Sequence, residues 1–278
     1  MNTNNNLYTI VYATLMVVAT AAILAFVSMA LKERQQKNID METQLSILSS
    51  VGLAADANGA SDKIAYVQGE YDKYITDSYL VNYKGETVPG DAFTAALKSQ
   101  YELIKQLDPK SGEDQTAIKD QIQIPVFECT LDSGEKVYIV ACYGTGLWGP
   151  IWGYIGFKSD FNTIYGAMFA HKGETPGLGA EIATPKFGDQ FKGKSIFDGD
   201  TFTSIAIVKG GADKDNPHEV DAVSGGTITS NALALAIQQW LGSYEGFFKL
   251  SAEKAKLQET AVQESAPVET NEVESAEN

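Results

Sequence analysis

The chain has 278 residues with 21 basic and 36 acidic side chains, so its net charge is −15 at neutral pH. Its hydrophobic content of 44% and charged content of 21% are close to globular averages, which excludes a wholly disordered, collagen-like or polytopic membrane protein. The acidic balance, with no cluster of Lys and Arg, also excludes a protein that binds nucleic acid.

A long apolar segment follows a short N-terminal tail, residues 1–6. Residues 7–31 carry no charged side chain and would span about 37 Å as a helix. This length predicts a single transmembrane anchor. A cleavable signal peptide is the alternative, but the run is longer than a signal-peptide core and no basic residue precedes it. Residues 32–66 are expected to form a juxtamembrane helix and a linker, with Leu45 and Leu48 at helical spacing.

Residues 67–255 are predicted to fold as one soluble α+β domain with a mainly antiparallel sheet. Asp91 is expected to cap a helix whose apolar stripe runs from Phe93 to Leu107. Strand-like runs separated by glycine-containing turns follow one another along the chain. Their ranges are 124–131, 137–143, 152–157, 163–170 and 203–208.

Two cysteines are too few for a disulfide framework or for a four-thiolate metal site. Cys129 and Cys142 lie in a predicted hairpin in which Asp132 faces Glu135 across a two-residue turn. In this register the thiols are about 13 Å apart along the strands, too far for a disulfide. Both are therefore predicted to be free and buried.

Residues 256–278 are predicted to form a disordered acidic tail. The last twenty residues contain six glutamates and neither Lys nor Arg. Because the segment has no aromatic residue, it cannot bury enough apolar surface to offset the entropy of ordering it. A solvated extension is expected, with partner binding as the alternative.

A turn rich in hydroxyl groups and glycine precedes a predicted amphipathic helix. The turn reads Asp221-Ala-Val-Ser224-Gly225-Gly226-Thr227-Ile-Thr229-Ser230, and the helix has an apolar stripe at Leu233, Ile237, Trp240, Leu241 and Tyr244. A helix start offers unpaired N–H groups and the positive end of the helix dipole, which together favour a phosphate. The alternative is a plain cap, in which Thr229 or Ser230 caps the helix and the glycines turn the chain.

The segment from Asp221 to Thr227 resembles an Asp-x-x-Ser/Thr-Gly-Ala-Thr motif. At that motif a flavin transferase attaches FMN through its phosphate to the last threonine; Gly226 replaces the usual alanine here. A second segment, from His171 to Gly179, resembles a His-x-Glu-Thr-Pro-Gly-Leu-Gly segment that packs against the flavin in the same family.

With the N-terminal span and Gly146-Leu147-Trp148, these motifs resemble the family of C subunits of the sodium-translocating NADH:quinone oxidoreductases, whose members carry a covalent FMN-binding domain. The G subunit of the related ferredoxin:NAD oxidoreductase complex shares both flavin motifs and is the alternative. From the residues alone, a membrane-tethered binding domain without a redox role is a further alternative.

The resemblance implies a role for each motif residue. Thr227 would carry the FMN through a phosphoester, with Thr229 as the alternative attachment residue or an additional hydroxyl donor. The other residues expected at the phosphate are Ser224, Gly225, Gly226 and Lys209. The residues expected around the flavin ring are Glu174, Thr175, Gly177 and Leu178, brought there by a turn at Pro176. Asp221 is expected to fix the turn or to be recognised by the transferase, because its charge would repel a phosphate.

The resemblance also implies an electron-relay subunit of an enzyme that passes electrons from NADH to quinone and moves sodium outward. The subunit would not be catalytic alone, and no catalytic residue or metal ligand is expected in it. Other membrane subunits of the complex and a flavin transferase are the expected partners. The expected location is the bacterial inner membrane with the soluble domain in the periplasm. Lys32, Arg34 and Lys37 after the span alone would place that domain in the cytoplasm.

Overall fold

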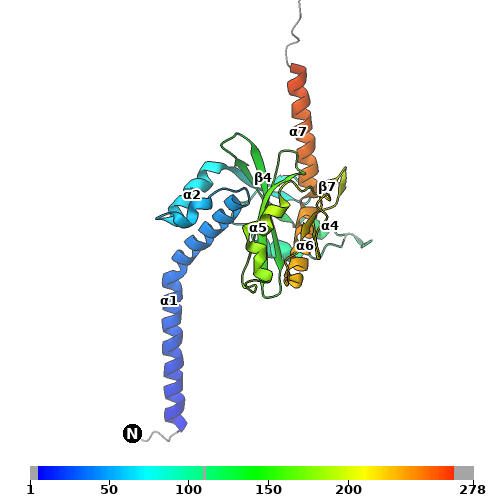
Figure 1. The fold of residues 1–278 in the computed structure, drawn as a ribbon. Helices are drawn as coiled ribbons and strands as arrows, with labels where there is room; N and C mark the ends of the chain where they lie inside the picture. The colour runs from blue at the N-terminus through cyan, green and yellow to red at the C-terminus, as the bar shows by residue number, and fades with distance from the viewer. Residues whose placement is uncertain (1–5, 109–110, 266–278) are drawn as a thin grey trace, which may run out of the picture.

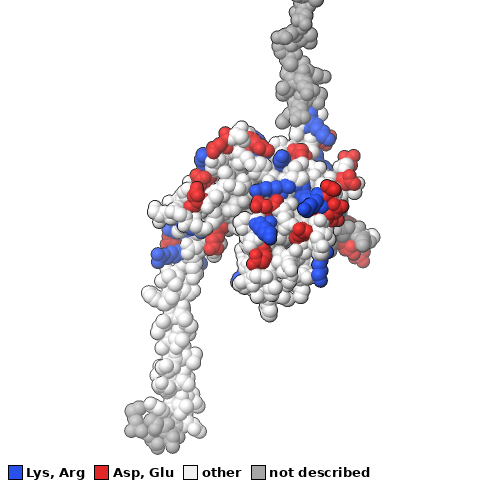
Figure 2. Space-filling view, viewed as in Figure 1, with Lys and Arg blue, Asp and Glu red and all other residues white. Residues whose placement is uncertain are grey.

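The structure is a computed structural model that describes residues 6–108 and 111–265 (Figure 1). Its first element is α1 (Asn6–Ser49), a continuous helix of 44 residues. Within these described residues, α1 is the one helix that is long and apolar enough to cross a membrane. Its N-terminal part is exposed and free of charge (Figure 2), whereas Met41, Ile47 and Leu48 are buried in the domain. The expected anchor and juxtamembrane helix are therefore parts of one helix.

Two helical segments that were not expected from the sequence follow α1. They are η1 (Ala55–Gly59) and α2 (Lys63–Tyr74), and the side chain of Asp62 caps α2 by accepting a hydrogen bond from Ala65 N. Val67 and Tyr74 of α2 are buried together with the end of α1. The expected start of the soluble domain at residue 67 falls inside α2.

Six antiparallel strands form the central sheet, in the order β2-β1-β3-β4-β5-β6. The strands are β1 (Ile75–Asn82), β2 (Thr87–Val88), β3 (Gln123–Thr130), β4 (Lys136–Thr145), β5 (Pro150–Phe157) and β6 (Ile164–His171). The predicted α+β domain with a mainly antiparallel sheet is confirmed. The four strands expected between residues 124 and 170 are present, and β1 and β2 add to them.

Smaller elements surround the sheet. Two short strand pairs are β7 (Phe197–Asp198) with β8 (Thr201–Phe202), and β9 (Ala206–Val208) with β10 (Glu219–Asp221), the latter pair parallel. The strand expected over 203–208 is thus only three residues long. The short helices are α3 (Leu97–Ile104), α4 (Thr116–Lys119), η2 (Gly179–Ala183), α5 (Pro185–Gly188) and η3 (Asp189–Phe191).

Asp91 does not cap α3, contrary to expectation. The helix begins at Leu97, and Asp91 Oδ1 instead accepts a hydrogen bond from Phe93 N at 2.9 Å. Asp91 therefore closes a turn that precedes the helix, a local arrangement that Asp side chains form as readily as a helix cap.

The β3–β4 hairpin differs from the expected register by one residue, since Cys129 faces Val137. The loop has three residues rather than two, because Leu131 N donates to Glu135 O at 3.0 Å. Gly134, the last loop residue, has φ +82°, which is typical of three-residue hairpin loops.

The prediction for the thiols is confirmed despite the shift in register. Cys129 and Cys142 are both free and buried. Burial raises the pKa of Cys129 to about 11 and that of Cys142 to about 12, so both thiols are protonated at neutral pH.

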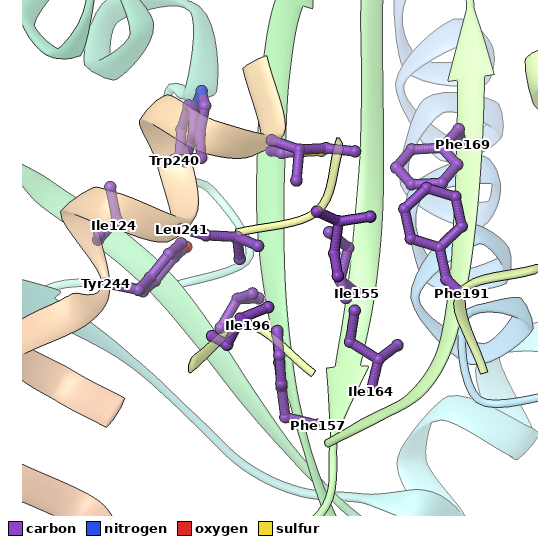
Figure 3. Packing of buried hydrophobic residues seen from close by; sticks show 14 of the residues in the cluster. Ile124, Ile155, Phe157, Ile164, Phe169, Phe191, Ile196, Trp240, Leu241 and Tyr244 are labelled. Carbon is purple, nitrogen blue, oxygen red and sulfur yellow. The ribbon is translucent and has the colours of Figure 1, made fainter. Parts of the chain in front are cut away.

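Helix α6 (Thr227–Ser243) packs on one face of the sheet and contributes to the main core. Figure 3 shows Leu241 of this helix directed toward β5, the strand that carries Ile155 and Phe157. Gly144 on β4 permits the close approach, because a Cβ there would lie 2.8 Å from the Cβ of Ala236. The end of α1 and α2 cover the other face of the sheet.

The last described helix is α7 (Glu245–Ser265), which leaves the domain at the end opposite to α1 (Figure 1). Phe247 and Phe248 in its first turn are buried. Residues 256–265 of the predicted acidic tail continue this helix, and residues 266–278 lie outside the described residues, so the disorder expected from residue 256 stays a prediction. This stretch is rich in Ala, Glu, Lys and Gln, which are strong helix formers and can extend a helix that packing has already started.

Candidate functional site

The site is built around the start of α6. Gly226 is the N-cap residue, and no side chain caps the helix. The first helical hydrogen bond runs from Ser230 N to Gly226 O at 2.8 Å, so the N–H groups of Thr227, Ile228 and Thr229 have no acceptor in the helix. None of the described residues accepts a hydrogen bond from them either. The first turn of α6 thus presents free N–H groups.

Neither candidate for a plain cap fills that role. Thr229 is only 2% exposed, and its hydroxyl donates to Glu174 Oε2 at 2.6 Å. Ser230 Oγ accepts a hydrogen bond from Val223 N at 3.1 Å. Both hydroxyls are therefore directed into the fold. Thr227, by contrast, is half-buried, and its hydroxyl makes no hydrogen bond with any described residue.

Glu174 joins three segments that are distant in sequence. Its side chain is 4% exposed, and Oε1 accepts from Trp148 N at 2.8 Å while Oε2 accepts from Thr229. Its own N–H donates to His171 Nδ1 at 3.1 Å. Glu174 therefore links the β4–β5 loop, the segment after β6 and the first turn of α6.

Two glycines make room for this carboxylate. A Cβ on Gly146 would lie 2.6 Å from Glu174 Oε1. A Cβ on Gly179 would lie 2.4 Å from Thr229 Oγ1 and 2.6 Å from Glu174 Oε2. Any side chain at either position would displace the carboxylate, so both glycines are required by close packing.

The expected turn around Pro176 is present. Leu178 N donates to Thr175 O at 3.1 Å, and Gly177 has φ +74°, which L residues rarely adopt. This turn brings Leu178 to the turn that precedes α6, residues 224–227, since a Cβ on Gly225 would lie 2.5 Å from Leu178 Cδ2. Thr175 and Gly177 lie at the surface of the same turn as Leu178.

Large apolar side chains are exposed around the start of α6. Trp148 is 67% exposed, Ile228 59%, Leu147 49% and Leu178 43%. Exposed apolar side chains gathered around free N–H groups indicate a ligand that is both apolar and anionic. In the sequence, Trp148 stood out only as part of the Gly146-Leu147-Trp148 stretch, and Ile228 was not singled out. A large apolar residue in a loop, Trp148, and another in the first turn of a helix, Ile228, were the signals that could have identified them.

Lys209 and Ser224 flank the same turn. Lys209 directly follows β9, and Ala222 N, just after β10, donates to Val208 O at 2.8 Å. Lys209 is exposed and forms no ion pair within the described part of the chain. Ser224 is exposed in the turn that precedes Thr227. The fold brings segments 174–178 and 224–229 into contact, and it pairs Val208, the neighbour of Lys209, with the strand that leads into the second segment.

A sequence profile of the FMN-binding domain family matches residues 146–242, which include the loop of Trp148, the turn of Leu178 and α6. The C subunit of the Na+-translocating NADH-quinone reductase of Vibrio anguillarum is 32% identical over 235 residues, 81% of this chain and 84% of that protein.

Two solved structures are similar. The crystal structure of the C subunit of the Na+-translocating NADH-quinone reductase from Parabacteroides distasonis has a TM-score of 0.64 and 39% identity, and the match covers 78% of this chain and 96% of that one. NqrC of Shewanella oneidensis has a TM-score of 0.59 and 29% identity, with 77% and 98% covered. Identity and coverage show that the chain belongs to the NqrC family, the C subunits of the Na+-translocating NADH-quinone reductases.

Proposed function

We propose that this chain is an electron-relay subunit of a Na+-translocating NADH-quinone reductase and that it carries one FMN bonded through its phosphate to Thr227. The observation that supports this most strongly is the uncapped first turn of α6, where free N–H groups lie beside an unpaired threonine hydroxyl. A structural cap would have used these groups internally.

The residues present fit both parts of FMN. The free N–H groups of the first turn, the helix dipole and the Lys209 ammonium suit a phosphate. Gly225 and Gly226 add no side chain that would hold the phosphate away. The apolar side chains of Leu147, Trp148 and Leu178 suit a flat aromatic ring.

Thr227 is better placed than Thr229 for the covalent bond. Thr229 is buried and its hydroxyl is held by Glu174, whereas the hydroxyl of Thr227 has no described partner. The Thr227 oxygen would lose its proton and bond to the flavin phosphate of a donor in which that phosphate is joined to a second phosphate. The bond to the second phosphate breaks, and the nucleotide that carries it leaves. A flavin transferase would supply this donor and catalyse the step.

FMN, once bound, supplies electron transfer one electron at a time. The chain's own residues hold it and shape its surroundings. Trp148 and Leu178 would shield the ring from water, and Glu174 keeps the loop of Trp148 in register with the first turn of α6.

Helix α1 serves in this proposal as a single-pass anchor in the bacterial inner membrane, and the soluble domain lies in the periplasm. The partners are the other membrane subunits of the complex, which as a whole oxidises NADH, reduces quinone and transports sodium. The apolar part of α1 carries no charged residue, so the sodium path is not assigned to this chain.

The test is the intact mass and visible spectrum of acid-precipitated, full-length protein from the native host. We expect a mass increase of one FMN less water and yellow colour that stays with the pellet. Both should be lost in Thr227→Ala and retained in the matched variant Thr229→Val. An unmodified, colourless native protein would overturn the proposal, and modification that persists in Thr227→Ala would overturn the assignment of Thr227.

A further inference from the structure

Asp221 is an acidic residue in a turn that we assign to a phosphate, yet its side chain is directed elsewhere. It is the last residue of β10, and its Oδ1 accepts a hydrogen bond from Ala212 N at 2.6 Å. Its own N–H donates to Gln190 Oε1 at 2.9 Å. The carboxylate therefore contacts the loop after β9 and not the turn at residues 224–227.

Two consecutive residues, Asp221 and Ala222, hold the two ends of this loop, residues 209–212. At its start, Val208 O accepts from Ala222 N at 2.8 Å, and at its end Ala212 N donates to Asp221. Between these points Gly210 and Gly211 have φ +94° and +111°. Two consecutive glycines in the left-handed region form a hinge with many accessible conformations. The bond to Asp221 removes this freedom by closing the loop.

Lys209 is the charged residue that the loop presents. It lies beside Val208, which pairs with Asp221 in the parallel register of β9 and β10. The neighbouring carboxylates are engaged otherwise, since Asp221 accepts from Ala212 N and Glu219 Oε2 accepts from Asp213 N at 3.2 Å. The Lys209 ammonium forms no ion pair among the described residues and remains available to an anion.

We propose that Asp221 is a positioning residue for the flavin phosphate: its carboxylate closes the 209–212 loop and thereby holds the Lys209 ammonium beside the turn that leads to Thr227. The inference rests on the proposed function, because the phosphate is the anion that Lys209 would meet. It explains how a carboxylate can precede a phosphate site without repelling the phosphate.

The experiment measures the rate at which full-length apoprotein in detergent gains FMN from a flavin transferase and its flavin donor, followed by intact mass. Asn at position 221 offers a carbonyl to Ala212 N, so Asp221→Asn should modify within about twofold of the wild type. Asp221→Ala and Lys209→Gln should each be about tenfold slower or more, the size expected for a hydrogen bond to a charged group. The double variant should be no slower than the slower single variant, because both act through one contact. Lys214→Gln, further along the same connection between β9 and β10, is the matched control and should be unchanged.

Hydrogen exchange of the apoprotein provides a second readout that needs no flavin. Amides of residues 209–212 should exchange faster in Asp221→Ala and at the wild-type rate in Asp221→Asn. The proposal is overturned if Asn is as slow to modify as Ala, if the two single effects multiply in the double variant, or if exchange is unchanged in Asp221→Ala. A wild-type chain that gains no flavin from an active transferase would overturn the proposed function and the phosphate role of Lys209, while the exchange data would still decide whether Asp221 closes the loop.

Discussion

The two ends of α6 have opposite surroundings. At its C-terminal end Trp240 and Leu241 are fully buried, Trp240 Nε1 donates to Tyr143 O at 2.7 Å, and the hydroxyl of the adjoining Tyr244 donates to Pro125 O at 2.7 Å. At its N-terminal end Ile228 is exposed and no side chain caps the helix.

The difference shows how one helix can be both well anchored and chemically open. Helices in proteins are stabilised mainly by packing of their apolar face, and α6 has that packing from Leu233 to Leu241. Its first turn therefore can leave N–H groups unpaired without unravelling. Substitutions at the two ends of α6 and in the turn before it test this difference.

Trp240→Ala should destabilise the fold strongly. It removes a fully buried ring and its hydrogen bond to Tyr143 O, and such substitutions cost about 3–5 kcal/mol. Ile228→Ala, at the exposed end of the same helix, should change the free energy of unfolding by less than about 0.5 kcal/mol. Urea unfolding followed by far-ultraviolet circular dichroism measures both. Similar losses for the two variants would contradict the proposed difference between the ends.

Glu174→Ala should destabilise the fold at the N-terminal end of α6. The change leaves the buried hydroxyl of Thr229 and the amide of Trp148 without their acceptor, which costs about 1–3 kcal/mol. Glu174→Gln is the matched control, since an amide oxygen can accept from Trp148 N while the amide nitrogen donates to Thr229. Thermal unfolding compares the two, and an equal loss in both would show that charge rather than geometry is the property that matters.

Gly225→Ala and Gly226→Ala test adjacent positions of the turn at residues 224–227. Gly225 has φ +73° and its added Cβ would meet Leu178 Cδ2 at 2.5 Å, so alanine should cost about 1–2 kcal/mol. Gly226 has φ −104° and its nearest contacts are 3.0–3.2 Å, so alanine needs only a small shift of its neighbours and should cost less than about 1 kcal/mol. Urea midpoints measure both, and a Gly226→Ala variant less stable than Gly225→Ala would refute this account of the turn.

Cys142, which lies on β4 beneath α6, should make the fold less stable at alkaline pH. Its pKa is raised by burial to about 12 in the folded chain, from an ordinary value near 9 in the unfolded chain. Above that ordinary value the unfolded chain releases the thiol proton first, so stability falls as pH rises.

The loss from this thiol is about 1 kcal/mol at pH 10. The comparison is the difference in urea midpoint between pH 8 and pH 10 for the wild type and for Cys142→Ala. The variant should lose less stability over this interval, and an equal loss would show that the thiol does not contribute.

Periodicity in the sequence was sufficient for α6 and for strands β3 to β6, but not for α2, β1 and β2. The stripe from Leu233 to Tyr244 predicted α6, and runs of β-formers predicted β3 to β6. Helix α2 was missed because its apolar positions are few and interrupted by polar residues. The β3–β4 register was misjudged because it depends on the conformation of one residue, Gly134, which the sequence does not reveal.

The candidate site was only partly predictable for a similar reason. Thr227 and its glycines stand in one short motif and are visible in the sequence. The partners of Glu174 are not, because Trp148 and Thr229 lie 26 and 55 residues away. The closure of the 209–212 loop by Asp221 is likewise a contact between a loop and a strand, which only the fold brings together.

The uninterrupted course of α1 has a consequence for geometry. With α1 as the proposed anchor, the helix passes from its charge-free segment to the buried Met41 without a flexible joint. The nine residues 32–40 then span about 14 Å along the helix between the bilayer and the domain, and each residue inserted there would turn the domain by about 100°. A flexible linker would let the site take many positions relative to the membrane. This helix instead holds the domain at one distance and in one orientation. The side of the domain that meets its neighbours in the complex is thus set by helical phase.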